Sequence, residues 1–224
     1  MNPSEDSLRD LRQKMVKLQL ESRDIKDKRV LDVFEKVPRH KFVGPKLYQD
    51  AYSDFPLPIG KGQTISQPYI VALMVQLLDV KKDDTVLEIG AGSGYETAIL
   101  AELAGKVFSV ERIESLAKDA LKALWELMYK NFQIKVGDGS LGWPEFAPFN
   151  KIIISASAEK APEVLLSQLN KGGRLVMPVG SRFTQTLVVI KKDVFGNITE
   201  KNICGCTFVP LIGKYGWQET TSTS

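Results

Sequence analysis

Residues 85–112, TVLEIGAGSGYETAILAELAGKVFSVER, decide the fold of this chain. A short apolar and β-branched run at residues 85–89 leads through Gly90, Gly92 and Gly94 into a helical segment, and a second apolar run follows at residues 106–110. This order predicts a strand, a glycine-rich turn, a helix and a second, parallel strand. Glycines in such a turn let the backbone approach a nucleotide-like ligand, and the amides of the helix point toward it.

Further strands and helices follow this unit. Short runs at residues 132–136, 151–155 and 174–179 predict strands, and residues 95–104, 113–129 and 162–169 predict helices between them. Runs at residues 186–192 and 198–209 flank a Gly-Asn turn signal and predict an antiparallel hairpin at the sheet edge. The predicted fold class is therefore α/β, a doubly wound and mostly parallel sheet with N-terminal helices and a C-terminal antiparallel hairpin.

The N-terminal part is expected to add two helices and a long irregular segment. Residues 4–21 carry apolar side chains at spacings of three and four, which predicts an amphipathic helix capped by Ser4 or Ser7, and residues 27–36 predict a second helix. Residues 39–68 show neither helical nor strand period, and their aromatic content indicates an ordered, functional segment. Pro68 begins another helix.

These elements form one expected domain, residues 1–217. Residues 1–67 supply the N-terminal helices and the substrate-side segment, and residues 68–217 supply the cofactor-binding core with the C-terminal hairpin. The Ser/Thr-rich tail, residues 218–224, is expected to be disordered.

Composition limits the classes of function. The 224 residues carry 30 Lys and Arg against 27 Asp and Glu, a formal net charge of +3, which gives no support to nucleic-acid binding. No apolar run is long enough to cross a bilayer, so we expect a soluble, cytoplasmic protein. Cys204 and Cys206 are too close for an ordinary disulfide, and with a single histidine they cannot complete a four-ligand zinc site. We therefore expect no metal and a reducing compartment.

Two carboxylates follow the strands beside the glycine-rich turn. Glu111 closes the second strand 17 residues beyond Gly94, where a carboxylate can accept hydrogen bonds from both hydroxyls of a ribose. The alternative is a surface ion pair with Arg112. Asp138, followed by Gly139, could accept a hydrogen bond from the exocyclic amine of an adenine, or could simply form an Asp-Gly turn.

The spacing of the glycines separates one nucleotide class from another. A dinucleotide site usually has G-x-G-x-x-G, whereas this chain has G-x-G-x-G with Glu88 two residues before the first glycine. A carboxylate beside the loop suits a cationic methionine end better than two phosphates. The alternative for Glu88 is a residue oriented by loop amides, with no ligand role. The pattern resembles the S-adenosylmethionine site of class I methyltransferases. That resemblance implies these cofactor-binding residues: Glu88, Gly90, Gly92, Ser93, Gly94, Glu111, Asp138 and Gly139.

A second candidate segment, LPIGKGQTISQP at residues 57–68, ends where a helix is predicted to start. Its glycines, hydroxyls and amides offer neutral donors at an anion-binding position, which suggests a carboxylate or phosphate acceptor. The alternative is a connection in which Ser66 merely caps the following helix.

Three long stretches resemble the protein-L-isoaspartate O-methyltransferase family: residues 51–74, AYSDFPLPIGKGQTISQPYIVALM; residues 86–112; and residues 137–180, GDGSLGWPEFAPFNKIIISASAEKAPEVLLSQLNKGGRLVMPVG. Residues 37–43 (VPRHKFV) and 208–211 (FVPL) share the resemblance, which spans roughly residues 8–217. Residues 155–158 (SASA) depart from the family's more usual Gly/Ala-rich stretch, which leaves cofactor contacts there open.

The resemblance implies methyl transfer from S-adenosylmethionine, which becomes S-adenosylhomocysteine, to the free α-carboxylate of L-isoaspartyl and often D-aspartyl residues in damaged proteins. The methyl ester then initiates repair through a succinimide. It also implies that Ser66 is catalytic, that Thr64, Ile65 and Ser66 contact the substrate, and that Val209 and Pro210 help to hold its backbone. We expect a monomer whose partners are isoaspartyl proteins and peptides, with no nucleic acid and no membrane.

Other functions remain open from the sequence. A carboxylate acceptor is already ionised at neutral pH and needs no general base, so His40 is expected to be structural. The rivals are another methyltransferase that acts on a small acid or on RNA, and a noncatalytic cofactor-binding adaptor that recognises aged proteins. A nicotinamide oxidoreductase is opposed by the glycine spacing.

Overall fold

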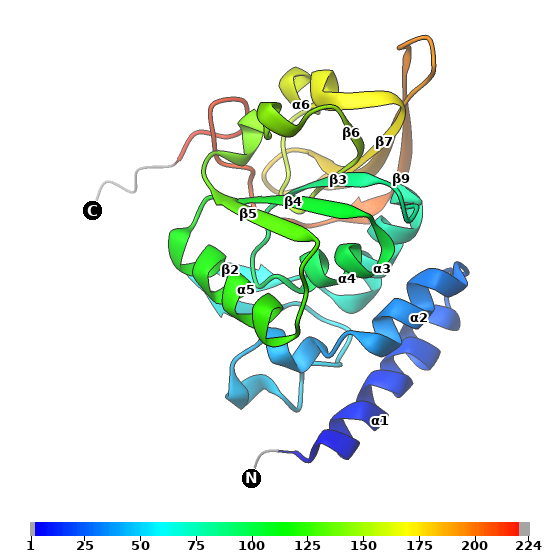
Figure 1. The fold of residues 1–224 in the computed structure, drawn as a ribbon, viewed down its shortest axis with the longest axis vertical. Helices are drawn as coiled ribbons and strands as arrows, with labels where there is room; N and C mark the ends of the chain where they lie inside the picture. Colours follow the sequence, from blue (N-terminus) through cyan, green and yellow to red (C-terminus); the bar gives the residue numbers. More distant parts are fainter. Residues whose placement is uncertain (1–2, 220–224) are drawn as a thin grey trace.

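The N-terminal helices are present as expected in the computed structural model, which describes residues 3–219. Helix α1 (Glu5–Met15) begins after Ser4, whose hydroxyl accepts a hydrogen bond from the Ser7 amide, and continues as the π-helical segment Val16–Glu21. Helix α2 (Lys28–Lys36) is capped by the side chain of Asp27. Figure 1 shows α1 and α2 at one end of the molecule, below α3 and α4.

A seven-stranded sheet forms the centre of the molecule, in the order β5-β4-β3-β6-β7-β8-β9. Strands β3 to β7 pair in parallel, and β8 and β9 add antiparallel pairs. The chain runs from β3 through β4 to β5 and then returns to the other side of β3, which places a topological switch point between β3 and β6. This arrangement confirms the predicted fold class. The strands are β3 (Thr85–Ile89), β4 (Lys106–Glu111), β5 (Phe132–Val136), β6 (Phe149–Ile154), β7 (Leu169–Gly180), β8 (Gln185–Lys192) and β9 (Ile198–Cys206).

Helices cover both faces of this sheet (Figure 1). Helices α3 (Pro68–Leu78), α4 (Tyr95–Leu103) and α5 (Glu114–Glu126) lie on one face, and α6 (Glu163–Gln168) lies on the other. Alternate strand residues divide between two apolar clusters: Val86 packs with α3, α4, α5 and the N-terminal helices, whereas Leu87 packs with α6. The period of two along each strand thus separates the two cores.

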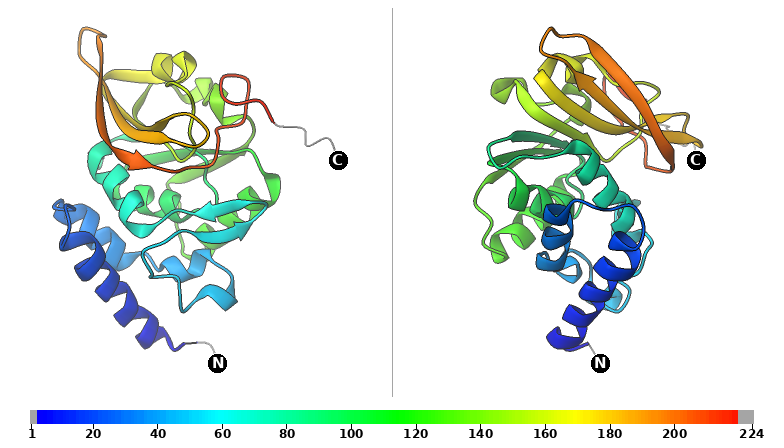
Figure 2. Two further views of the ribbon diagram at one scale, coloured as in Figure 1. Left: turned by 180° about the vertical axis from the view of Figure 1, so that it is seen from behind. Right: turned by 90° about the vertical axis from the view of Figure 1, so that its right-hand side faces the viewer.

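The segment predicted to be irregular, residues 39–68, contains a small hairpin that the sequence pattern did not reveal. Strands β1 (Leu57–Gly60) and β2 (Gln63–Ile65) pair antiparallel in a sheet of their own, seen from behind in Figure 2. Gly60, Lys61 and Gly62 all have positive φ (91°, 53° and 68°) and form its turn. The remainder includes the 3₁₀ turns Arg39–Phe42 and Pro45–Leu47, and two more lie at Gly139–Leu141 and Pro144–Phe146.

After β9 the chain crosses back over the sheet. Pro210 forms a parallel bridge with Ser157, and the Trp217 indole donates a hydrogen bond of 3.0 Å to the Ser157 carbonyl. The predicted strand over residues 198–209 therefore ends three residues earlier, at Cys206. Most of the tail predicted to be disordered, residues 220–224, lies outside the described residues. Within the described residues, no helix is long and apolar enough to span a membrane.

Candidate active site

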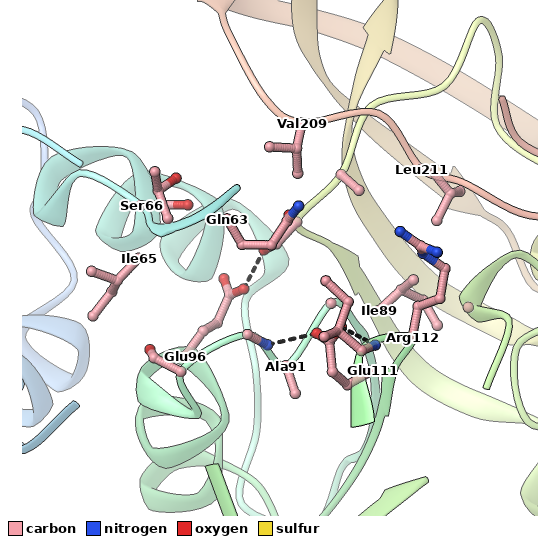
Figure 3. Close-up of a pocket in the computed structure, with 18 of the residues that line it drawn as sticks. Gln63, Ile65, Ser66, Ile89, Ala91, Glu96, Glu111, Arg112, Val209 and Leu211 are labelled. Atoms are coloured by element: carbon pink, nitrogen blue, oxygen red, sulfur yellow. Dashed lines mark hydrogen bonds between the residues drawn. The ribbon is translucent and has the colours of Figure 1, made fainter. Parts of the chain in front are cut away.

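A cavity of about 240 Å³ lies at the carboxyl ends of the strands around the switch point. In open α/β sheets this is where ligands bind. Its walls come from the end of the β1–β2 hairpin, the glycine-rich turn, the ends of β4 and β6, and residues 209–212 (Figure 3). Ten of the predicted site residues line it: Thr64, Ile65, Ser66, Gly90, Gly92, Ser93, Glu111, Gly139, Val209 and Pro210.

The glycine-rich turn needs its glycines for backbone conformation and for close packing. Gly90, Gly92 and Gly94 have φ values of 93°, 54° and 86°. Gly94 caps α4 and lies away from the cavity wall, and a Cβ atom on it would come within 3.1 Å of the Ala120 side chain on α5. Its predicted role in cofactor binding is therefore supported only as a requirement for the shape of the turn.

Glu111 fixes that turn from the end of β4. Its Oε2 atom accepts a hydrogen bond of 2.9 Å from the Gly92 amide, and its Oε1 atom accepts one of 2.8 Å from the Ile113 amide. Each carboxylate oxygen retains capacity to accept a further hydrogen bond, and Glu111 lines the cavity. Arg112 pairs with Glu219 at 3.1 Å, so the alternative of an ion pair between Glu111 and Arg112 is not formed.

Glu88 was expected to bind the cofactor, but it does not line the cavity and lies behind the glycine-rich turn. It shares the sheet face of Val86, and the carboxylate is fully buried between β3, β4 and α4. Its Oε2 atom accepts a hydrogen bond of 2.6 Å from the Thr97 hydroxyl and another from the Ser109 hydroxyl. Burial, reinforced by the nearby charge of Glu96, raises the pKa of Glu88 well above its usual range.

Asp138 also lies off the cavity wall, although Gly139 is part of it. The Asp138 carboxylate accepts hydrogen bonds from the Ser140 amide and hydroxyl and, at 2.7 Å, from the Lys214 amide. The Lys214 bond ties the C-terminal segment to the end of β5. Desolvation alone would raise the pKa of Asp138, but the hydrogen bonds outweigh it and keep that pKa below its usual range. A bond to an adenine amine, which remains a prediction, would have to use the remaining lone pair of Oδ2.

Glu96, which sequence reasoning did not select, lines the cavity from the first turn of α4 (Figure 3). Only 8% of the residue is exposed, and Oε2 accepts a hydrogen bond from the Ser155 hydroxyl at the end of β6. Burial raises the pKa of Glu96 above its usual range. An acidic residue in the first turn of a helix is ordinarily explained by the helix dipole, so the sequence carried no separate signal for it.

Ser66 is held by a buried arginine that sequence reasoning also missed. Arg39 is 0% exposed, and its guanidinium donates bonds of 2.8 Å to the Ala51 carbonyl and 2.7 Å to the Ser66 carbonyl. It also lies over the Tyr95 ring, 4.9 Å from the centroid. Burial lowers the pKa of Arg39 to about 10, so the group remains charged at neutral pH.

His40 lies off the cavity wall, and its ring nitrogens face Tyr52 and Glu5. It is 1% exposed, and its Nδ1 atom lies 2.7 Å from the Tyr52 hydroxyl. Burial lowers its pKa, and Glu5, 3.4 Å from Nε2, opposes that effect.

The cavity suits a nucleoside joined to a small charged chain. Glu111 presents acceptors beside the glycine-rich turn, where ribose hydroxyls are bound in such folds. Glu96 presents a buried carboxylate oxygen without a partner, Oε1, at the Ser155 side of the same turn. No lysine lines the cavity as described, and the described residues contain no cluster of metal ligands. The fold and the site together define a class I S-adenosylmethionine-dependent methyltransferase.

Comparison with known proteins gives the family. The family model described as Protein-L-isoaspartate(D-aspartate) O-methyltransferase (PCMT) matches residues 10–216, and the chain belongs to this family. It is 55% identical over 207 residues to the Protein-L-isoaspartate O-methyltransferase of Trichlorobacter lovleyi, covering 92% of this chain and 95% of that protein. The counterpart in Geobacter metallireducens is 53% identical over 206 residues, again covering 92% and 95%.

A solved structure supports the same assignment. The putative protein-L-isoaspartate O-methyltransferase of Plasmodium falciparum, in complex with S-adenosyl-L-homocysteine, superposes with a TM-score of 0.78. It is 27% identical, and the match covers 90% of this chain and 98% of that one.

Proposed function

We propose that this protein transfers the methyl group of S-adenosylmethionine to the free α-carboxylate of L-isoaspartyl residues in damaged proteins. The ester formed can close to a succinimide, whose hydrolysis returns some normal aspartate. One observation carries the proposal: Ser66 and Val209, from the two segments expected to hold the substrate, face the glycine-rich turn across a single cavity. D-Aspartyl residues are a second expected substrate.

The acceptor group determines what the chain must supply. A substrate carboxylate has a pKa near 4 and is ionised at neutral pH, so no side chain has to remove a proton. When bound, S-adenosylmethionine supplies an electrophilic methyl group on a sulfonium centre. The chain therefore contributes orientation above all, and Ser66 is the residue we assign to hold the acceptor carboxylate through its hydroxyl.

The polarity of the cavity supports this division of roles. An anion and a cation combine into neutral products, so a strongly cationic or water-filled site would stabilise the reactants more than the transition state. The residues that accompany Ser66 on the wall from β2, Gln63, Thr64 and Ile65, are neutral. The one cationic side chain on the described wall, Arg112, is engaged by Glu219.

We assign the cofactor to the opposite wall. Gly90, Gly92 and Ser93 would present backbone to it, Glu111 would accept the ribose hydroxyls, and Gly139 would lie against the adenine. The buried position of Glu88 favours the alternative kept from the sequence, in which it has no direct ligand contact and instead supports the turn from behind through Thr97 and Ser109.

We further infer that one chain is the active unit and that it works in the cytoplasm. Residues of one chain from both the substrate side and the cofactor side, Ser66 and Glu111 among them, line the same cavity. Cys204 and Cys206 are both free thiols, which suits a reducing compartment. Residues 1–67 and 68–217 form one folding unit in this proposal, because Leu8 and Val86 belong to the same apolar cluster. Sedimentation velocity should then give a single species near 24.9 kDa.

The decisive experiment uses methyl-labelled S-adenosylmethionine and two peptides that differ only in carrying isoaspartate or normal aspartate at one position. We expect base-labile label on the isoaspartyl peptide alone. Label on both peptides, or label on neither while the cofactor still binds, would refute the proposed substrate and favour a different acceptor or a noncatalytic adaptor.

A further inference from the structure

Glu96 is the carboxyl group on the cavity wall to which no role has been assigned. Its position is fixed on both sides: the backbone belongs to the first turn of α4, and the carboxylate oxygen Oε2 is held by the Ser155 hydroxyl. The backbone of Ser155 is in turn bonded to Ile89, since its amide donates 2.9 Å to the Ile89 carbonyl at the start of the glycine-rich turn. Glu96 is therefore a fixed part of the cavity wall beside the glycine-rich turn, and Figure 3 shows its carboxylate directed toward the cavity.

One oxygen of this carboxylate has no partner. Oε1 of Glu96 is buried and makes no hydrogen bond within the described chain. Leaving such an acceptor unsatisfied is costly, and buried orphan groups in native proteins call for an explanation such as a missing ligand. A donor that enters the cavity from the cofactor side would satisfy it.

The charges around Glu96 favour a positive partner. Glu88 lies behind it on β3, with its own Oε1 atom buried and unpartnered, and Glu111 lies at the end of β4. The hydroxyl of Ser155 is the group that faces Glu96 from β6. The two arginines of the region are engaged elsewhere, Arg39 over the Tyr95 ring and Arg112 with Glu219. Thus Glu96 and Glu111 on the cavity wall, and Glu88 behind it, have no cationic side chain paired with them within the described residues.

We propose that Glu96 binds the ammonium group at the amino-acid end of S-adenosylmethionine, and that it gives up a proton to solvent when the ligand binds. This inference rests on the proposed function, because it assumes that cofactor. It assigns the Ser155 side of the glycine-rich turn to the amino-acid end and the Glu111 side to the ribose, so that the methyl group between them faces Ser66.

The proton balance follows from the geometry. Two buried, neighbouring carboxyl groups cannot both be ionised without a counter-charge, so Glu88 and Glu96 together retain a proton in the empty cavity. An entering ammonium supplies the counter-charge, the ionised form of Glu96 becomes favourable, and the proton leaves to the buffer. Burial, which raises the pKa of Glu96, places this release within reach of neutral pH. Affinity must therefore rise with pH over the range in which the empty site is still protonated.

The test compares two ligands and two variants by isothermal titration calorimetry. S-Adenosylhomocysteine carries the ammonium group, and 5′-methylthioadenosine lacks the whole amino-acid end. Glu96→Gln removes the charge at nearly constant volume. Glu102→Gln is the matched control, because Glu102 lies on the last turn of the same helix, off the cavity wall, and bonds to Lys36 and the Tyr129 hydroxyl. Working at about pH 6 to 7 keeps the ligand ammonium protonated.

We expect Glu96→Gln to weaken S-adenosylhomocysteine by about 10- to 100-fold, the value of one hydrogen bond to a charged group, and to leave 5′-methylthioadenosine within about twofold. Glu102→Gln should change neither. Equal weakening of both ligands would make Glu96 merely structural, and an unchanged affinity for S-adenosylhomocysteine would also overturn the proposal. Failure of the unmodified protein to bind S-adenosylhomocysteine would instead refute the proposed function.

A second measurement does not depend on any variant. Titrations at about pH 6 in two buffers with different ionisation enthalpies count the protons released on binding. The unmodified protein should release up to one proton per S-adenosylhomocysteine, and its affinity should rise between about pH 5.5 and pH 7. No release together with a flat pH profile would overturn the inference.

Discussion

Replacement of Arg39 by methionine should disturb the position of Ser66 and leave the binding of the cofactor unchanged. The substitution keeps a long, flexible side chain in the buried site but removes every donor. The carbonyl groups of Ala51 and Ser66 then lose bonds of 2.8 and 2.7 Å. Each buried carbonyl left unpaired costs about 1–3 kcal/mol, and the lost contact with the Tyr95 ring adds about 0.5–2 kcal/mol.

Removal of the buried charge offsets part of this loss of folding free energy. Methionine needs no desolvated guanidinium, and replacing a buried charge by an apolar group often returns some stability. We therefore expect the free energy of unfolding to fall by about 2–5 kcal/mol. An ordinary domain has a free energy of unfolding of about 5–15 kcal/mol. Arg39→Lys should lose less, because a single ammonium can still reach one of the two carbonyls.

Urea unfolding measures the stability change, and steady-state kinetics measures the effect on the site. Arg39 donates a hydrogen bond to the Ser66 carbonyl and is absent from the cavity wall. In Arg39→Met, KM for an isoaspartyl peptide should therefore rise, or turnover should fall. The affinity for S-adenosylhomocysteine should stay within about twofold of that of the unmodified protein. An unfolding midpoint equal to that of the unmodified protein would refute the stability argument. Equal losses in peptide and cofactor binding would refute the positioning argument.

Ser66→Ala should lower turnover of an isoaspartyl peptide by about 10- to 100-fold, the value of one hydrogen bond to a carboxylate, and an unchanged rate at saturating peptide would remove the hydroxyl from the mechanism. Glu111→Gln should weaken S-adenosylhomocysteine at least about tenfold in calorimetry, because the ribose loses a charged acceptor; a change below about twofold would contradict that role. Gly94→Ala should cost about 1–3 kcal/mol in urea unfolding, since φ is 86° and the new methyl group would lie 3.1 Å from a side chain on α5. Gly44→Ala, with φ of −64° and open space around it, is the control and should stay within about 0.5 kcal/mol. Burial lowers the pKa of His40, so the unfolded chain takes up the proton first and stability should fall as the pH drops below about 6.5; His40→Gln should flatten that fall in thermal unfolding, and an equal slope would assign it to another group.

The elements with strong local patterns could be predicted from the sequence. Strands β3 and β5 begin and end where the apolar runs do, and Pro68 starts α3 as expected. The β1–β2 hairpin was not predicted, because its strands span only four and three residues, too few to show the alternation of a strand. What stabilises it is burial of Leu57 and Ile65, a tertiary effect with no local signature.

The sequence predicted the site residues that belong to local motifs. It missed those that folding brings to the site from other parts of the chain. Proximity to Gly90 suggested that Glu88 faces the ligand, but strand alternation turns that side chain toward α4. The carboxylate of Glu96 lines the cavity beside the turn instead. The bonds of Arg39 reach 12 and 27 residues along the chain, so no spacing rule could have connected it with Ser66.

The crossing of the C-terminal segment over the sheet has a consequence for biosynthesis. The walls of the cavity are drawn from residues 62–212, and Val209 to Ile212 come last. On the ribosome, the glycine-rich turn and its neighbouring strands emerge early and can fold as they appear, whereas the substrate side is completed only when residues 209–212 have left the exit tunnel. Until that point a growing chain lacks part of the cavity wall, and a premature stop after β9 would remove Val209 to Ile212 from the site.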